Sequence, residues 1–272
     1  MKSENGHSVI TGLGVALWLC PKKGTPLYDK LTTLNSSLNT LFPGQAPRFE
    51  PHVTITTNID IDLEDKEKTR QEVDTILSAS AVALRSLPQN HEKLVTLGKL
   101  NSQRYRFKKL YLEVDRDPNL VSFARIIREL FVALPQCKEK QNQQLNPQLY
   151  TVDSHGVAVK RSLSKKLKRQ SSDTSSLKPI DVQLAQQEAA DMAAQWSIEE
   201  FQPHVSLVYS SLHPIDNALW RTIKTRIQDF LNIPSCDNLR EHGFGWDGGV
   251  LKLVYCEGDV GDWVVLGSVD IH

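Results

Sequence analysis

The spacing of apolar residues near the start of the chain predicts one strand and one helix. Residues 13–20 form an almost unbroken apolar run, which is typical of a buried strand. A helical pattern follows, with Thr25 as its cap and Pro26 in its first turn. It ends at Pro43 and Gly44. Its leucines fall on one face, which we assign to the core: Leu27, Leu31, Leu34, Leu38 and Leu41.

Strand and helix patterns alternate along the rest of the chain. Helices are predicted at about 63–86, 118–134 and 181–196 and from near Pro214, and strands near 94–100, 107–114, 249–256 and 262–271. Such an alternation predicts an α+β fold with helices on the outside of the sheets.

A six-residue phrase occurs twice, as Phe49-Glu50-Pro51-His52-Val53-Thr54 and as Phe201-Gln202-Pro203-His204-Val205-Ser206. Because alternate residues of a strand share a face, each histidine stands beside a hydroxyl, His52 beside Thr54 and His204 beside Ser206. The duplication predicts a single two-lobed domain over residues 1–272. We expect two antiparallel sheets, related by a pseudo-twofold, to line a central cleft.

Two histidines facing one another suit displacement at a phosphodiester. With an unperturbed pKa of about 6.5, one imidazole can take a proton from water while the other donates one to the leaving oxygen. The hydroxyls can hydrogen-bond the non-bridging oxygens, and neither a metal nor a cofactor is required. We assign His204 as the base and His52 as the acid, although the near symmetry of the motifs leaves the opposite assignment open.

A single His-Val-Thr is most often an ordinary strand start, and a duplicated domain without activity is the structural alternative. Strand propensity favours β-branched residues and does not account for a histidine preceded by proline in both copies. The repeat therefore favours catalysis.

Several segments besides the motifs resemble one family. The paired His-x-Thr and His-x-Ser resemble the two-histidine phosphoesterase superfamily. The resemblance narrows to the fungal 2′,3′-cyclic-nucleotide 3′-phosphodiesterases and covers the chain except for residues 136–180. It rests on four further segments: Ala16-Leu17-Trp18-Leu19-Cys20-Pro21, Leu41-Phe42-Pro43, residues 107–114, and the tail with Val254-Tyr255-Cys256-Glu257-Gly258 and residues 263–267.

The resemblance implies hydrolysis of ADP-ribose 1″,2″-cyclic phosphate, a by-product of tRNA splicing, and of nucleoside 2′,3′-cyclic phosphates to 2′-phosphates. It implies that His52 and His204 are the acid–base pair and that Thr54 and Ser206 bind phosphate. It also implies a Golgi association and a substrate-binding role for Tyr209. On a regular strand Tyr209 would point away from Ser206, so the strand must end or bulge before it. The alternative is a core tyrosine.

Composition adds few constraints. Lys plus Arg balance Asp plus Glu at 32 each, so net charge indicates no polyanionic partner. We expect no membrane span and no signal peptide, hence a cytosolic location, and a monomer that acts on a small cyclic phosphate. The four cysteines lack metal-finger spacing and are interpreted as free thiols: Cys20, Cys137, Cys236 and Cys256.

Residues 138–178 differ from the rest of the chain. They carry nine Lys and Arg against three Asp and Glu, a net charge of +6, and include a serine-rich run at 171–176. We expect a mobile basic insertion. Such a segment is usually a solvated linker, but it also supports an RNA-directed phosphoesterase acting on 2′–5′ linkages or RNA ends. A silent module that binds cyclic phosphates or RNA is the third alternative.

Overall fold

The computed structural model describes residues 14–42, 47–88, 93–104, 106–152, 158–160, 177–210 and 214–271. The chain divides into two compact units, one of Met1–Ile127 with Glu200–His272 and one of Arg128–Glu199. Both copies of the repeated phrase belong to the first unit. The units therefore do not correspond to the two lobes predicted from the repeat.

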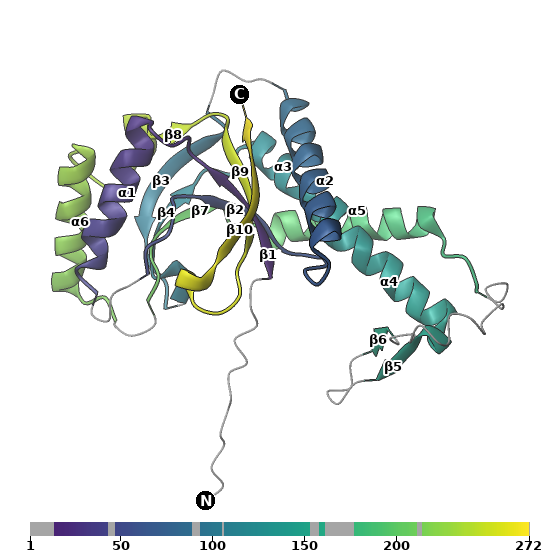
Figure 1. The fold of residues 1–272 in the computed structure, drawn as a ribbon. Helices are drawn as coiled ribbons and strands as arrows, with labels where there is room; N and C mark the ends of the chain where they lie inside the picture. The colour runs from purple at the N-terminus through teal and green to yellow at the C-terminus, as the bar shows by residue number, and fades with distance from the viewer. Residues whose placement is uncertain are drawn as a thin grey trace, which may run out of the picture. The chain divides into compact units, whose positions relative to one another are not determined.

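The first unit contains an eight-stranded sheet in the order β10-β9-β1-β2-β7-β4-β3-β8. All neighbouring strands are antiparallel, and Figure 1 shows the strands curling into part of a barrel. The strands are β1 Val15–Cys20, β2 Val53–Ile59, β3 Val95–Asn101, β4 Leu110–Val114, β7 His204–Val208, β8 Gly245–Trp246, β9 Gly249–Tyr255 and β10 Val264–Ile271.

The sheet consists of two four-stranded halves that meet between β2 and β7. Strands β2 and β7 pair at only one position, Val53 with Val205, whereas β1 and β9 pair along six residues. The α+β class is confirmed. The two sheets predicted from sequence are these two halves, which join into one sheet at the repeated phrases.

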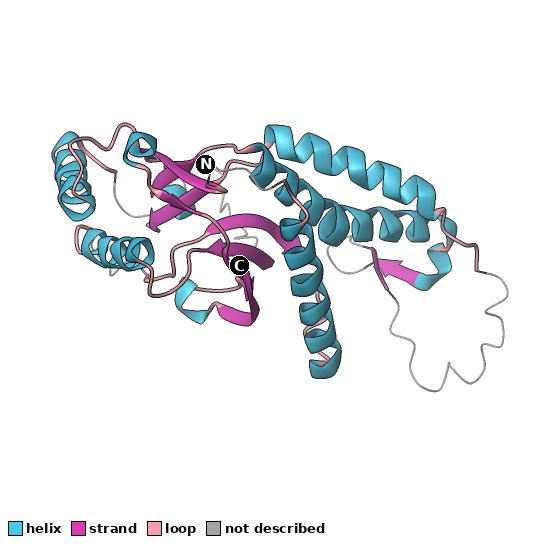
Figure 2. Cartoon of the chain, turned by 90° about the horizontal axis from the view of Figure 1, so that it is seen from above, coloured by secondary structure: helices cyan, strands magenta, loops and turns pink. Residues whose placement is uncertain are grey.

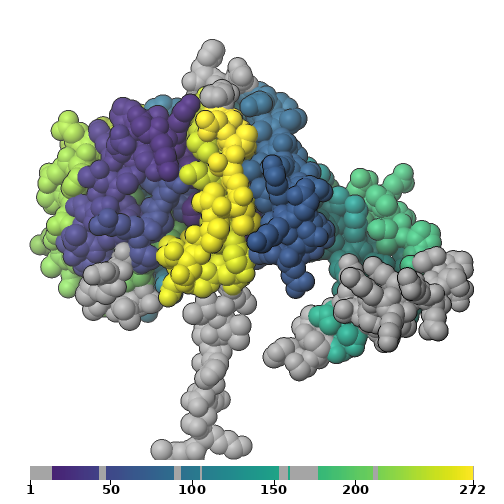
Figure 3. Space-filling model, in the orientation of Figure 1, coloured from purple at the N-terminus to yellow at the C-terminus, as the bar shows by residue number. Residues whose placement is uncertain are grey.

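Four helices belong wholly or mainly to the first unit: α1 Pro26–Asn39, α2 Lys66–Arg85, α3 Pro118–Arg128 and α6 Asn217–Leu231. Helix α1 packs against β7 and lies beside α6 (Figures 1 and 2), and α2 packs against β9 and β10. In Figure 3, β10 is the yellow edge strand on the surface, and most of its residues are at least partly exposed. The helices cover the sheet from outside, as predicted.

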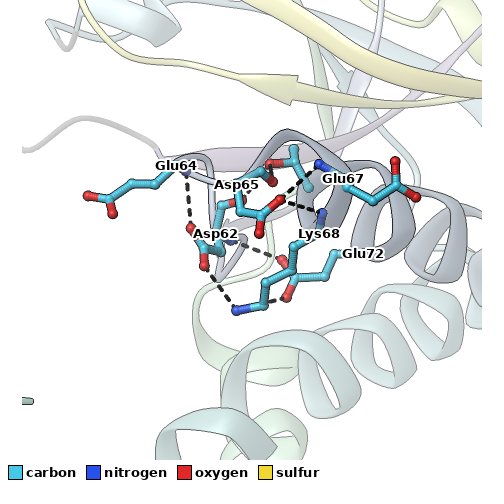
Figure 4. Close-up of polar contacts among 7 residues, drawn as sticks. Asp62, Glu64, Asp65, Glu67, Lys68 and Glu72 are labelled. Carbon is cyan, nitrogen blue, oxygen red and sulfur yellow. Dashed lines mark hydrogen bonds and ion pairs between the residues drawn. The ribbon is translucent and has the colours of Figure 1, made fainter. Parts of the chain in front are cut away.

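The predicted helix starts are supported by side-chain caps. Thr25 accepts a hydrogen bond from the backbone of Tyr28 at the start of α1, and Asp65 accepts from the first turn of α2. Around Asp65, Lys68 also pairs with Asp62 at 3.0 Å and with Glu72 at 3.7 Å (Figure 4). These exposed ion pairs account for the charged start of α2 without a catalytic role.

The core confirms the apolar patterns. All six residues of β1 are buried, as expected for a strand covered on both faces. Three leucines of the predicted stripe face inward, because Leu31, Leu34 and Leu38 are at most 1% exposed, whereas Leu27 is partly buried and Leu41 lies beyond the end of α1 at Asn39. Burying each such side chain stabilises the fold by about 2 kcal/mol.

The second unit contains a π-helical turn at Glu129–Ala133, α4 Leu134–Leu145, the short strands β5 Tyr150–Val152 and β6 Ala158–Lys160, and α5 Val182–Glu199. Alanines 185 and 189 of α5 pack on Ala133 and Cys137. The predicted end of a helix at Leu134 is wrong, because the chain continues as α4 despite Pro135. The π-helical turn accommodates this proline, which has no N–H to donate.

The boundary predicted for the basic insertion also needs correction. Residues 138–145 are helical, and the Asn146 side chain is 2% exposed and hydrogen-bonds both backbone groups of Lys178. Polar residues here are ordered by specific hydrogen bonds, which composition does not reveal. Residues 161–176, with most of the basic and serine-rich sequence, lie outside the described residues.

Candidate active site

The junction of the two half-sheets brings the repeated phrases together. Val53 pairs directly with Val205 in an antiparallel arrangement. One step along such a ladder in each direction sets His52 opposite Ser206 and Thr54 opposite His204. The four predicted residues are thus the neighbours of this one pair, two on each strand.

His52 is held on two sides. Its Nδ1 hydrogen-bonds the backbone oxygen of Glu50 at 2.6 Å, and its ring stacks on the indole of Trp18, with centroids 3.6 Å apart and planes 7° apart. A carbonyl oxygen only accepts, so Nδ1 carries the hydrogen and Nε2 of the neutral ring is the basic nitrogen. The side chain is 4% exposed, and its orientation is therefore fixed before substrate binds.

His204 repeats this backbone contact in a more open setting. Its Nδ1 hydrogen-bonds the backbone oxygen of Gln202 at 2.8 Å, so its Nε2 is again the basic nitrogen. The Tyr111 ring meets the imidazole edge-on, with centroids 5.4 Å apart. The residue is only partly buried. In both phrases the residue two before the histidine fixes the tautomer, with proline between them.

Burial lowers the pKa of both histidines. The pKa of His52 falls to about 3, because desolvation disfavours the imidazolium and the charges of His204 and Lys252 act in the same direction. The hydrogen bond to Glu50 opposes this shift. The pKa of His204 falls to about 4 through desolvation and the nearby charge of Lys108, against the hydrogen bond to Gln202. Both rings are therefore neutral at pH 7 in the unliganded protein.

The two predicted hydroxyls differ in their partners. Ser206 is 5% exposed and donates to the backbone oxygen of Phe107 at 3.0 Å. Thr54 is partly exposed, and its strand partner is Trp18 of β1. The Ser206 hydroxyl is thus fixed by neighbouring chain, whereas the Thr54 hydroxyl is positioned by the strand alone.

Tyr209 directly follows β7, which ends at Val208. The strand end frees Tyr209 from the strict alternation that would turn it away. Its ring stacks on Phe49 of the first phrase, with centroids 3.9 Å apart. Burial raises the pKa of Tyr209, so it remains a neutral donor. The ring is 5% exposed, which also agrees with the alternative of a core tyrosine.

Sequence reasoning missed several residues that surround the two phrases. Phe107 and Trp263 contact Tyr209, with ring centroids 5.2 Å and 6.1 Å away. Trp18 is covered by His52 and Trp263 and is 5% exposed. These side chains come from strands and loops distant in sequence, so no local motif marks them.

The residues two before each histidine contact a lysine. Lys252 of β9 binds the Glu50 carboxylate at 2.5 Å, and the Tyr28 hydroxyl donates to the same carboxylate at 3.1 Å. Lys108 binds the side-chain oxygen of Gln202 at 3.1 Å. Each repeat therefore fixes its histidine by a backbone carbonyl and has a lysine beyond it.

Among the described residues, no group of three or more His, Cys, Asp or Glu is arranged to hold a metal ion. The four cysteines are buried and free. Within the described ranges, every helix is too short or too polar to span a bilayer.

Comparisons with known proteins identify the family of the chain. The family described as "Cyclic phosphodiesterase-like protein" matches residues 13–271. The chain is 61% identical over 260 residues to a protein of Candida albicans named 2′,3′-cyclic-nucleotide 3′-phosphodiesterase, covering 96% of this chain and all of the relative. A protein of the same name from Debaryomyces hansenii is 62% identical over 242 residues, which is 88% of this chain and all of that relative.

A more distant protein of the same name, from Saccharomyces cerevisiae, is 27% identical over 298 residues, 95% of this chain and all of the relative. The curled antiparallel sheet with its outer helices has the α+β fold of a phosphoesterase. The chain belongs to the cyclic phosphodiesterase-like family. The family match also runs through residues 136–180, which the resemblance based on motifs had left out.

Proposed function

We propose that this protein hydrolyses nucleoside 2′,3′-cyclic phosphates to nucleoside 2′-phosphates. The pairing of Val53 with Val205 carries the proposal, because a histidine and a hydroxyl residue flank each of the two paired valines. The name shared by the relatives supports the same reaction and the same bond, the ester to the 3′ oxygen.

In the proposed reaction Nε2 of His204 takes a proton from water as the water oxygen bonds to phosphorus. The bond from phosphorus to the 3′ oxygen breaks, and His52 gives its proton to that oxygen. The greater exposure of His204 favours it as the residue that meets water, and the burial of His52 favours it as the acid, which needs no solvent. Thr54 and Tyr209 donate hydrogen bonds to the non-bridging oxygens, and Ser206 does so when its hydroxyl hydrogen turns from the Phe107 carbonyl to the phosphate.

The acid must carry a proton that the unliganded site disfavours. A bound phosphodiester places a negative charge beside His52 and raises its pKa, since an opposite charge stabilises the imidazolium. The face of Trp18 stabilises the same cation through its ring electrons. Substrate binding thus favours the protonated form of His52, the acid, whereas His204, the base, is already neutral.

The proposal extends to ADP-ribose 1″,2″-cyclic phosphate, which contains the same five-membered cyclic diester. The resemblance in the motifs implies that compound and a role after tRNA splicing. It also implies a Golgi association. The common chemistry is a ribose cyclic phosphate, and the assay below compares both compounds with an oligoribonucleotide that ends in one.

Phosphorus NMR of nucleoside 2′,3′-cyclic phosphate tests the reaction. The chelator-treated protein should give the 2′-phosphate alone, and His52→Ala and His204→Ala should give almost none. His242→Ala is the matched control, because His242 is exposed outside the site. No product from any of the three compounds would reject hydrolysis, and a 3′-phosphate would reject the proposed bond.

A further inference from the structure

The lysines beyond the two histidines have different electrostatic surroundings. On the first side, Lys252 and the Glu50 carboxylate are 2.5 Å apart, and their side chains are 11% and 16% exposed. Lys23 adds a weaker contact with the same carboxylate at 3.9 Å. The positive charge of Lys252 is therefore largely neutralised by the adjacent Glu50 carboxylate.

On the second side, a neutral amide takes the place of the carboxylate. Lys108 donates to the side-chain oxygen of Gln202, and no carboxylate in the described part of the chain forms an ion pair with it. Desolvation alone lowers the pKa of Lys108, with no compensating negative group. This ammonium is a partly dehydrated and uncancelled positive charge.

Three contacts fix Lys108 on the His204 side of the site. Gln202 binds its ammonium and, through the backbone, His204 Nδ1. The ammonium also lies 5.9 Å from the centroid of Tyr111, the ring that His204 meets edge-on. The preceding residue, Phe107, accepts the hydrogen bond of Ser206. The short helix Arg106–Lys108 thus holds both a phosphate-binding hydroxyl of the proposed site and this cation.

We propose that Lys108 is a further substrate-binding residue, whose ammonium holds an anionic oxygen of the phosphate on the His204 side. The inference rests on the proposed function. A cyclic diester carries one negative charge, and the monoester product carries up to two near pH 7. Lys108 therefore binds the product's phosphate at least as strongly as the substrate's. Gln202 positions Lys108 but does not neutralise its charge. Glu50, in contrast, neutralises the charge of Lys252.

Replacing Gln202 by Glu tests this assignment most directly. Gln202→Glu keeps the backbone carbonyl and nearly the same side-chain shape, but it supplies the carboxylate that the first repeat already has. We expect Gln202→Glu and Lys108→Met each to raise the inhibition constant of nucleoside 2′-phosphate and the KM by about tenfold, the loss typical of a charge-assisted hydrogen bond. The value of kcat should change much less.

Two variants serve as controls. Lys108→Arg should return the inhibition constant to within about threefold of the original, because the charge remains. Lys224→Met should leave it unchanged, since Lys224 is on α6 and pairs with Asp237. Thermal unfolding of each variant identifies any loss of folded protein.

Calorimetric binding of nucleoside 2′-phosphate separates this inference from the proposed function, because it requires no turnover. Weaker binding to both Gln202→Glu and Lys108→Met supports Lys108 as the anion site, whatever the protein's activity. Unchanged binding by either folded variant overturns it. Absence of turnover by the original protein, with binding retained, would reject only the hydrolysis.

Discussion

The two copies of the repeated phrase have nearly the same backbone contacts and very different surroundings. Each histidine donates from Nδ1 to the carbonyl two residues earlier. His52 is then enclosed by Trp18 and a carboxylate–lysine pair, whereas His204 remains partly exposed beside an uncancelled lysine. A repeated sequence therefore reproduces the orientation of the ring, and the neighbouring strands determine what each ring does.

The largest expected effect is the loss of either histidine. His52→Ala and His204→Ala should each lower kcat for the cyclic phosphate by about 10³- to 10⁴-fold, because each removes one proton transfer. If the roles differ, a substrate with a better leaving group at the 3′ position should rescue His52→Ala and not His204→Ala. Equal rescue of both would contradict the assignment of His52 as the acid.

Acid should destabilise the protein through its buried histidines. Between pH 6.5 and about 3, His52 is protonated in the unfolded chain but neutral in the folded protein. The free energy of unfolding therefore falls as the pH decreases across this window. The loss from His52 is about 4 kcal/mol. Urea unfolding at pH 7 and pH 4 should give a smaller difference for His52→Gln than for the original protein.

The same pair of measurements on His242→Gln provides the comparison for an exposed histidine. Its pH dependence should equal that of the original protein. If His52→Gln also behaves like the original, the histidine is not the source of the acid sensitivity.

Breaking the charge pair on the first side should cost more stability than altering its neutral counterpart. Glu50→Gln leaves the largely buried Lys252 without its carboxylate and should lower the free energy of unfolding by about 3 kcal/mol. Gln202→Ala removes one neutral contact to a more exposed lysine and should cost about 1 kcal/mol. Urea unfolding at pH 7 measures both, and equal losses would show that the two sides do not differ in this way.

The smallest effects separate the two hydroxyls. Thr54→Val and Ser206→Ala should each reduce kcat/KM about tenfold, as expected for one lost hydrogen bond in the transition state. Only Ser206→Ala should also reduce stability, because the Ser206 hydroxyl donates to the backbone oxygen of Phe107. An equal decrease of the thermal unfolding temperature in both variants would contradict this distinction.

Local patterns predicted most helices and strands of the first unit and identified the repeated phrase. The apolar run of β1, the leucine stripe of α1 and the i, i+2 spacing of histidine and hydroxyl are all short-range signals. The pairing of Val53 with Val205 is not a short-range feature, because the register depends on both strands and on all the chain between them.

The residues that distinguish the two sides could not be predicted for the same reason. Trp18 belongs to β1, which pairs with β2, and Lys252 belongs to β9 on the other side of β1. Lys108 precedes β4, which pairs with β7. Each is an ordinary residue in its own segment. Even the π-helical turn before α4 is invisible to a rule that ends a helix at proline.

The junction at Val53 and Val205 has a mechanical consequence. Every other neighbouring pair of strands in this sheet has at least two paired residues, so β2 and β7 form the natural line along which the sheet can hinge. A phosphate held by hydroxyls of both repeats crosses that line. Ligand should therefore slow hydrogen–deuterium exchange of the amides in β2 and β7 more than in β1 and β9, and the protein would stiffen along a line that is also its site of chemistry.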